Sequence, residues 1–179
     1  SISILSQHPA VVARMIATID DISNGRCGLN IVTGWNRPEY AQMGMWPGDE
    51  HYQSRYDYAA EYVQILQELW REGRASWDGR YFQLDDCSVL PTPNREIPLV
   101  CAGASPAGRQ FVAQYADHQF VLTSEDKLVG SVADIRAKAI ETKRDVGIYA
   151  LFHLIVADSD QQARAEVDAI IAGADQGAI

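Results

Sequence analysis

The chain alternates between short β-rich apolar segments and longer segments whose apolar residues recur at helical spacing. Between residues 9 and 22 the apolar residues repeat every three or four positions, with Pro9 suited to a first turn and Asn24-Gly25 to a helix end. The same reasoning predicts helices over 55–72, 105–116, 131–143 and 159–172, and strands over 27–33, 99–102, 118–122 and 148–157. Alternating strands and helices indicate a parallel sheet covered by helices.

Two segments interrupt this alternation. Residues 34–51 form a long irregular stretch rich in Gly, Pro and aromatic residues, and loops of this length commonly have a function. Further along, Trp77-Asp78-Gly79-Arg80-Tyr81 places an Asp-Gly turn between aromatic flanks, which predicts an inserted β-hairpin.

Two architectures fit a parallel sheet of this kind. A flavodoxin-like or Rossmann sheet would be complete within 179 residues, whereas a (β/α)8 TIM barrel would show about half of its strands. The chain opens without Met in Ser1-Ile2-Ser3-Ile4, which resembles the trailing half of a strand. We therefore expect an incomplete central portion of an α/β barrel, with about four strand-helix units and the hairpin, as one partial domain over 1–179.

Composition narrows the classes of function. The net charge of −9 and the pI near 4.8 disfavour nucleic acid as a partner. No apolar run reaches the roughly 20 residues of a membrane span, and no secretory leader is recognisable at the start. Three scattered cysteines and four scattered histidines lack metal-ligand spacing, so we expect no metal site and a reducing cytoplasm.

Three places could bind an anion or a polar ligand. Gly103-Ala104-Ser105-Pro106 joins a strand to a helix and could hold a phosphate, although an ordinary helix cap is the more frequent use of such a turn. Asn30 lies inside a strand, where a ligand or the backbone could pair its amide. Arg55-Tyr56 suits an anion at a helix start, but a solvated Arg beside a packed Tyr explains it better.

Of the histidines, His8 and His51 could reach a barrel mouth and act there as acid or base near neutral pH. Neither sits at a spacing that identifies a catalytic group. We therefore assign no catalytic residue from the sequence.

A series of motifs resembles the luciferase-like flavin-dependent monooxygenases. The first two are 8–14 (His-Pro-Ala-Val-Val-Ala-Arg) and 25–35 (Gly-Arg-Cys-Gly-Leu-Asn-Ile-Val-Thr-Gly-Trp). Motifs at 38–40, 43–49, 55–58, 85–87 and 173–176 resemble the pyrimidine oxygenase branch in particular. The resemblance extends over nearly the whole chain.

This resemblance implies a luciferase-like TIM barrel that binds reduced FMN from a separate flavin reductase and uses O2 to oxidise a small organic substrate. In the pyrimidine branch the reaction opens the ring of uracil or thymine. Matching positions imply that FMN contacts Asn30, Glu39, Arg55, Tyr56 and Ser105. The stretch from Trp35 to Trp46 would cover the site, and a homo-oligomer is expected.

Two features favour other readings. The turn Ser6-Gln7-His8-Pro9 resembles sulfone and aminopolycarboxylate monooxygenases of the same superfamily, and an alkanesulfonate substrate belongs to the same alternative. The stretch 122–132 departs from the Gly-rich loop expected after its strand. A non-catalytic flavin-binding or structural piece is a third alternative, because part of a barrel leaves strand edges and apolar faces exposed.

Overall fold

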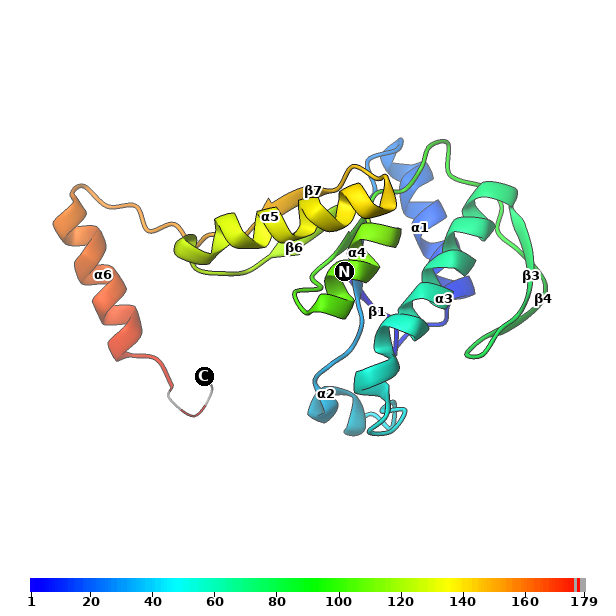
Figure 1. Cartoon of the computed structure of the whole chain (residues 1–179), viewed down its shortest axis with the longest axis horizontal. Coiled ribbons are helices and arrows are strands. Elements are labelled where there is room, and N and C mark those ends of the chain that lie inside the picture. The colour runs from blue at the N-terminus through cyan, green and yellow to red at the C-terminus, as the bar shows by residue number, and fades with distance from the viewer. Residues whose placement is uncertain (176, 178–179) are drawn as a thin grey trace.

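The computed structural model describes residues 1–175 and 177 and contains one five-stranded parallel sheet with an antiparallel hairpin beside it (Figure 1). The sheet order is β1 (Ile2–Ser3), β2 (Leu29–Val32), β5 (Leu99–Cys101), β6 (His118–Val121) and β7 (Gly147–Ala150). Each strand therefore pairs with the next sheet strand along the chain. Among the described residues, no helix is long and apolar enough to cross a membrane.

The helices α1 (Pro9–Ser23), α3 (His51–Glu72), α4 (Pro106–Tyr115) and α5 (Glu125–Thr142) connect or follow these strands. Neighbours in this series contact one another, α1 with α3, α3 with α4 and α4 with α5. Right-handed crossovers between strands in sequential order place α1, α3, α4 and α5 on one face of the sheet. This arrangement matches the outer layer of a (β/α)8 barrel and confirms the predicted fold class.

The core lies between the sheet and this helix layer. Leu29 and Ile31 of β2 are buried and alternate with the half-buried Asn30 and Val32, which face the other side of the sheet. Tyr62 of α3 is fully buried, and its hydroxyl donates a hydrogen bond to the Gln7 carbonyl, 2.9 Å away. The face with Asn30 corresponds to the interior of a barrel.

The hairpin is confirmed where the Asp-Gly turn predicted it. Strands β3 (Arg74–Asp78) and β4 (Gln83–Ser88) pair antiparallel, and the Gly79 N–H donates to the Phe82 carbonyl at 2.9 Å. The Glu61 carboxylate of α3 accepts hydrogen bonds from the Trp77 indole and from the backbone N–H groups of Tyr81 and Phe82. The hairpin tip is therefore fixed to α3.

Several predicted boundaries are wrong. The long helix predicted from Arg55 begins four residues earlier, at His51. Its first turn carries no apolar repeat, so the helical pattern in the sequence did not reveal this turn. The helix predicted from Ser131 begins at Glu125, since its exposed first turn is acidic and suits the helix dipole. The strand predicted over 27–33 is β2, which begins only at Leu29, where pairing with β5 starts.

The last sheet strand is shorter than the predicted 148–157. β7 ends at Ala150, and the Leu151 N–H makes the final bond to the Val121 carbonyl, 3.1 Å away, where β6 also ends. A strand cannot continue without a partner for its backbone groups. Helix α6 (Asp160–Ala172) follows as predicted, has no buried residue, and lies apart from the other helices (Figure 1). Of the closing motif 173–176, Gln176 lies outside the described residues.

Candidate functional site

The predicted binding residues of the turn before α4 lie beyond the carboxyl end of β5. In parallel α/β structures, ligands bind beyond the carboxyl ends of the strands. Ser105 is the N-cap of α4: its backbone is extended and its Oγ accepts a hydrogen bond from the Gly108 N–H at 3.1 Å. Pro106 has no N–H, so the Ala107 N–H remains a first-turn donor without an intrahelical acceptor. Ser105 therefore caps α4, while the Ala107 N–H and the positive end of the helix dipole remain available to an anion.

Two glycines allow the backbone to approach itself closely at this turn. A Cβ placed on Gly103 would lie 2.7 Å from the backbone of Gly108, which is too short for any real contact. A Cβ placed on Gly108 would lie 2.5 Å from the Tyr56 hydroxyl. The turn, the first turn of α4 and the Tyr56 hydroxyl therefore meet in a compact cradle, which we define as Gly103, Ser105, Gly108 and Tyr56.

Arg55 borders this cradle from α3. Its guanidinium lies over the rings of Tyr52 (4.0 Å) and Tyr56 (4.7 Å) and donates to the Tyr52 carbonyl. Because α3 begins at His51, Arg55 and Tyr56 occupy its second turn and do not share the helix N-terminus that the sequence reading gave them. The aromatic rings hold the guanidinium at the surface, where several of its five donors remain free.

The other two predicted residues lie elsewhere. Asn30 sits on the face of the sheet that no helix covers; its Nδ2 donates to the Ser1 hydroxyl at 2.9 Å, and its Oδ1 has no hydrogen-bond partner among the described residues. Glu39 is exposed in the short helix α2 (Arg37–Ala41). Within the described part of the chain, no side-chain hydrogen bond or ion pair joins either of them to the cradle. The structure thus groups Arg55, Tyr56 and Ser105, and leaves Asn30 and Glu39 apart.

The stretch 34–51 is more ordered than the predicted loop, because it contains α2. Tyr40 of α2 is buried, and its hydroxyl accepts a hydrogen bond from the Ser3 Oγ at 2.9 Å, at the end of β1. Trp46 packs edge-on against the His51 ring, with centroids 5.4 Å apart, while Trp35 is exposed. One side of this stretch is therefore anchored, and the other is open at the carboxyl end of β2.

Both histidines considered as acid or base have structural contacts. The buried His51 has its Nε2 at 3.1 Å from the Thr33 carbonyl and at 3.0 Å from the Gly34 carbonyl, so Nε2 carries the hydrogen and donates. His8 caps α1, where its Nδ1 accepts from the Ala10 N–H at 3.2 Å, and burial lowers the pKa of His8. No group of three possible metal ligands occurs among the residues described.

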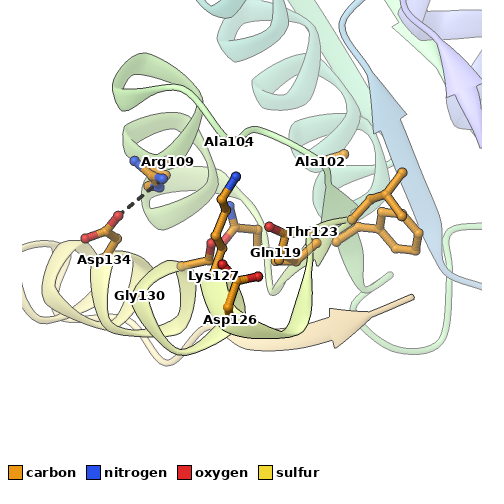
Figure 2. A pocket seen from close by; sticks show the side chains of 13 residues that line it. Ala102, Ala104, Arg109, Gln119, Thr123, Asp126, Lys127, Gly130 and Asp134 are labelled. Atoms are coloured by element: carbon orange, nitrogen blue, oxygen red, sulfur yellow. Dashed lines mark ion pairs between the residues drawn. The ribbon is translucent and has the colours of Figure 1, made fainter. Parts of the chain in front are cut away.

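A groove of about 650 Å³ adjoins the turn on the side of β6 (Figure 2). It lies between α4 and α5, where Arg109 and Asp134 form an ion pair at 3.2 Å. Gln119 of β6 and Lys127 of α5 also line it. The sequence patterns did not indicate these residues, because nothing local marks them as neighbours of the turn before α4.

Comparison with known proteins identifies the family. The family model described as luciferase-like monooxygenase matches residues 1–178. The chain belongs to the luciferase-like monooxygenase family. Curated relatives include "Pyrimidine monooxygenase RutA" of Rhizobium rhizogenes, 49% identical, and that of Serratia proteamaculans, 47% identical; each match covers 98% of this chain and 49% of the relative. The chain thus spans about half the length of these relatives.

Solved luciferase-like structures show the same fold. Riboflavin lyase RcaE, described with modified FMN and riboflavin, aligns with a TM-score of 0.84 and 25% identity, over 96% of this chain and 44% of that one. EDTA monooxygenase from Chelativorans sp. BNC1 aligns with a TM-score of 0.83 and 23% identity, over 97% of this chain and 46% of that one. The predicted family and fold are therefore confirmed.

Proposed function

We propose that this chain provides the FMN-binding part of a flavin-dependent monooxygenase that uses reduced FMN and O2 to open the ring of uracil or thymine. The observation that carries the proposal is the cradle formed by Gly103, Ser105, Gly108 and Tyr56 at the N-terminus of α4. The substrate rests on the identity of 47–49% with relatives named pyrimidine monooxygenases.

The cradle suits a phosphate in three respects. Gly103 and Gly108 allow the turn, the first turn of α4 and the Tyr56 hydroxyl to lie close together, and the helix N-terminus offers N–H donors and a positive dipole end. The Tyr56 hydroxyl adds a donor from α3, and Arg55 beside it supplies a positive charge. These are the chemical groups that a phosphate monoester requires.

The remaining predicted contacts fit the polar parts of a flavin. Asn30 has an unpaired Oδ1 on the barrel-interior face, and an N–H or O–H of the cofactor would satisfy it. Glu39 lies in α2 beside the buried Tyr40, within the stretch that we propose covers the site. By covering the bound ligand, the stretch from Trp35 to Trp46 would exclude water.

The bound flavin would supply the oxygen chemistry, and the protein would bind, orient and shield the reactants. Arg55, Tyr56 and Ser105 would hold the phosphate, and Asn30 would orient the polar edge of the ring. Reduced FMN would come from a separate flavin reductase. The three free cysteines suit the reducing cytoplasm in which we place the reaction, and we expect a homo-oligomer.

Titration of FMN against the protein, followed by quenching of flavin fluorescence, tests the binding site. We expect Ser105→Ala and Arg55→Ala each to weaken FMN binding about tenfold, the effect of losing one bond to a charged group. Ser54→Ala is the matched control, because the Ser54 hydroxyl bonds only the Glu50 carbonyl within α3. Equal affinities for all four proteins would contradict the assigned phosphate site.

Turnover tests the substrate separately. With FMN and a reductase, we expect product formation that depends on uracil or thymine. A protein that binds FMN saturably but forms no product from either pyrimidine would contradict the pyrimidine assignment. FMN binding with no oxidation of any substrate would favour the non-catalytic alternative. The turn that resembled sulfone and aminopolycarboxylate enzymes has a structural explanation here, because His8 caps α1.

A further inference from the structure

Gln119 is a polar residue in a position that the fold gives to apolar side chains. It lies in β6 beside Cys101 of β5, on the face that the helices cover, and it is only 2% exposed. Burying an amide is unfavourable unless its groups are paired. Its Nε2 donates to the Gly103 carbonyl at 2.8 Å, whereas its Oε1 has no partner among the described residues. The Gln119 side chain lines the groove (Figure 2).

This bond fixes the peptide group between Gly103 and Ala104. In a trans peptide the C=O and the N–H point in opposite directions. Because Gln119 holds the Gly103 oxygen toward β6, the Ala104 N–H must point away from Gln119. The backbone of Gly108 packs against Gly103 and restricts the same turn from the side of α4.

The orientation matters because glycine has few steric barriers to rotation of an adjacent peptide. If this peptide rotated by half a turn, the turn would present a carbonyl oxygen where it now presents an N–H. A carbonyl oxygen repels a phosphate, whereas an N–H binds it. The buried Gln119 amide on β6 therefore determines whether the turn presents an N–H or a carbonyl oxygen to a ligand.

We propose that Gln119 is a positioning residue that locks the Gly103–Ala104 peptide so that its N–H faces the cofactor phosphate. The inference rests on the proposed FMN site and extends it to a residue that does not touch the ligand. It also accounts for an amide in the helix-covered face of the sheet.

The test compares FMN with riboflavin, which differ by the phosphate alone. In Gln119→Met, which keeps the size of the side chain and removes the donor, we expect FMN affinity to fall about tenfold while riboflavin affinity stays unchanged. Gln114→Met is the matched control, since Gln114 is exposed on α4. Equal losses for both flavins would show a merely structural role and overturn the inference.

A second measurement needs no variant. In amide NMR spectra of the wild-type protein, we expect the Ala104 N–H resonance to shift with FMN and to stay in place with riboflavin. An unchanged Ala104 resonance at saturating FMN would overturn the inference. Wild-type protein that binds both flavins equally would overturn the phosphate site itself, whereas a preference for FMN that persists in Gln119→Met would overturn only the role of Gln119.

Discussion

Replacing Gly108 with alanine tests the close packing that forms the cradle. The new Cβ would lie 2.5 Å from the Tyr56 hydroxyl and 2.7 Å from the Gly103 Cα. The tyrosine can rotate away, but the Gly103 backbone is held by Gln119, so the first turn of α4 has to move. Alanine would ordinarily stabilise a helix by about 1 kcal/mol relative to glycine.

Overpacking a tight contact costs about 1–3 kcal/mol, and the rigid backbone partner places Gly108→Ala in the upper part of that range. After the gain in helix propensity, the free energy of unfolding should fall by about 1–2 kcal/mol. With a urea dependence of about 2 kcal/mol per molar, the unfolding midpoint should drop by about 0.5–1 M. Circular dichroism at the helix band during a urea titration measures this midpoint.

Gly130→Ala in α5 is the matched control, because a Cβ there meets nothing within 4 Å. Helix propensity alone acts at Gly130, so its midpoint should rise by up to about 0.5 M. A midpoint for Gly108→Ala at or above that of the wild type would refute the packing argument.

Three further predictions concern other parts of the fold. Glu61→Gln should lower the free energy of unfolding by about 1–3 kcal/mol, because an NH2 group would face hairpin donors such as the Trp77 indole; an unchanged urea midpoint would contradict this. Because the pKa of His8 is lowered below 6.5 in the fold, the contribution of His8 to stability is present above pH 6.5 and is lost as the pH falls. Asparagine can still cap α1 but does not titrate, so His8→Asn should show a smaller fall in melting temperature between pH 7 and pH 5 than the wild type. Burial raises the pKa of Cys101 to about 11, so at pH 8 a thiol reagent should modify the half-buried Cys87 and spare Cys101, and equal rates would contradict the burial of β5.

The sequence predicted the elements whose signals are local. Asn24 and Gly25 adopt the left-handed conformation expected at a helix end, and Ser105 with Pro106 forms the expected helix start. The end of β7 depends on where β6 stops, and the first turn of α3 depends on contacts of the buried His51 with the Thr33 and Gly34 carbonyls just after β2. Such boundaries are decided by partners distant in sequence, so local patterns could not give them.

The residues of the candidate site also fall into some that the sequence indicated and some that only the structure shows. The resemblance named Tyr56 and Ser105, and the structure brings them together through Gly108, which the sequence reading had passed over. Gln119 was missed because a single amide in a short strand has no local signature. Its role follows from a bond that spans 16 positions of the chain.

The sequential pairing of the sheet strands has a consequence for synthesis on the ribosome. Each strand from β2 onward finds its neighbour already made when it emerges, because the pairs run β1 with β2, β2 with β5, β5 with β6 and β6 with β7. The two hairpin strands β3 and β4 pair with each other, so the hairpin can form before any later strand is synthesised. The nascent chain can therefore lengthen its sheet one strand-helix unit at a time, and each new strand covers the edge of the strand before it while translation continues.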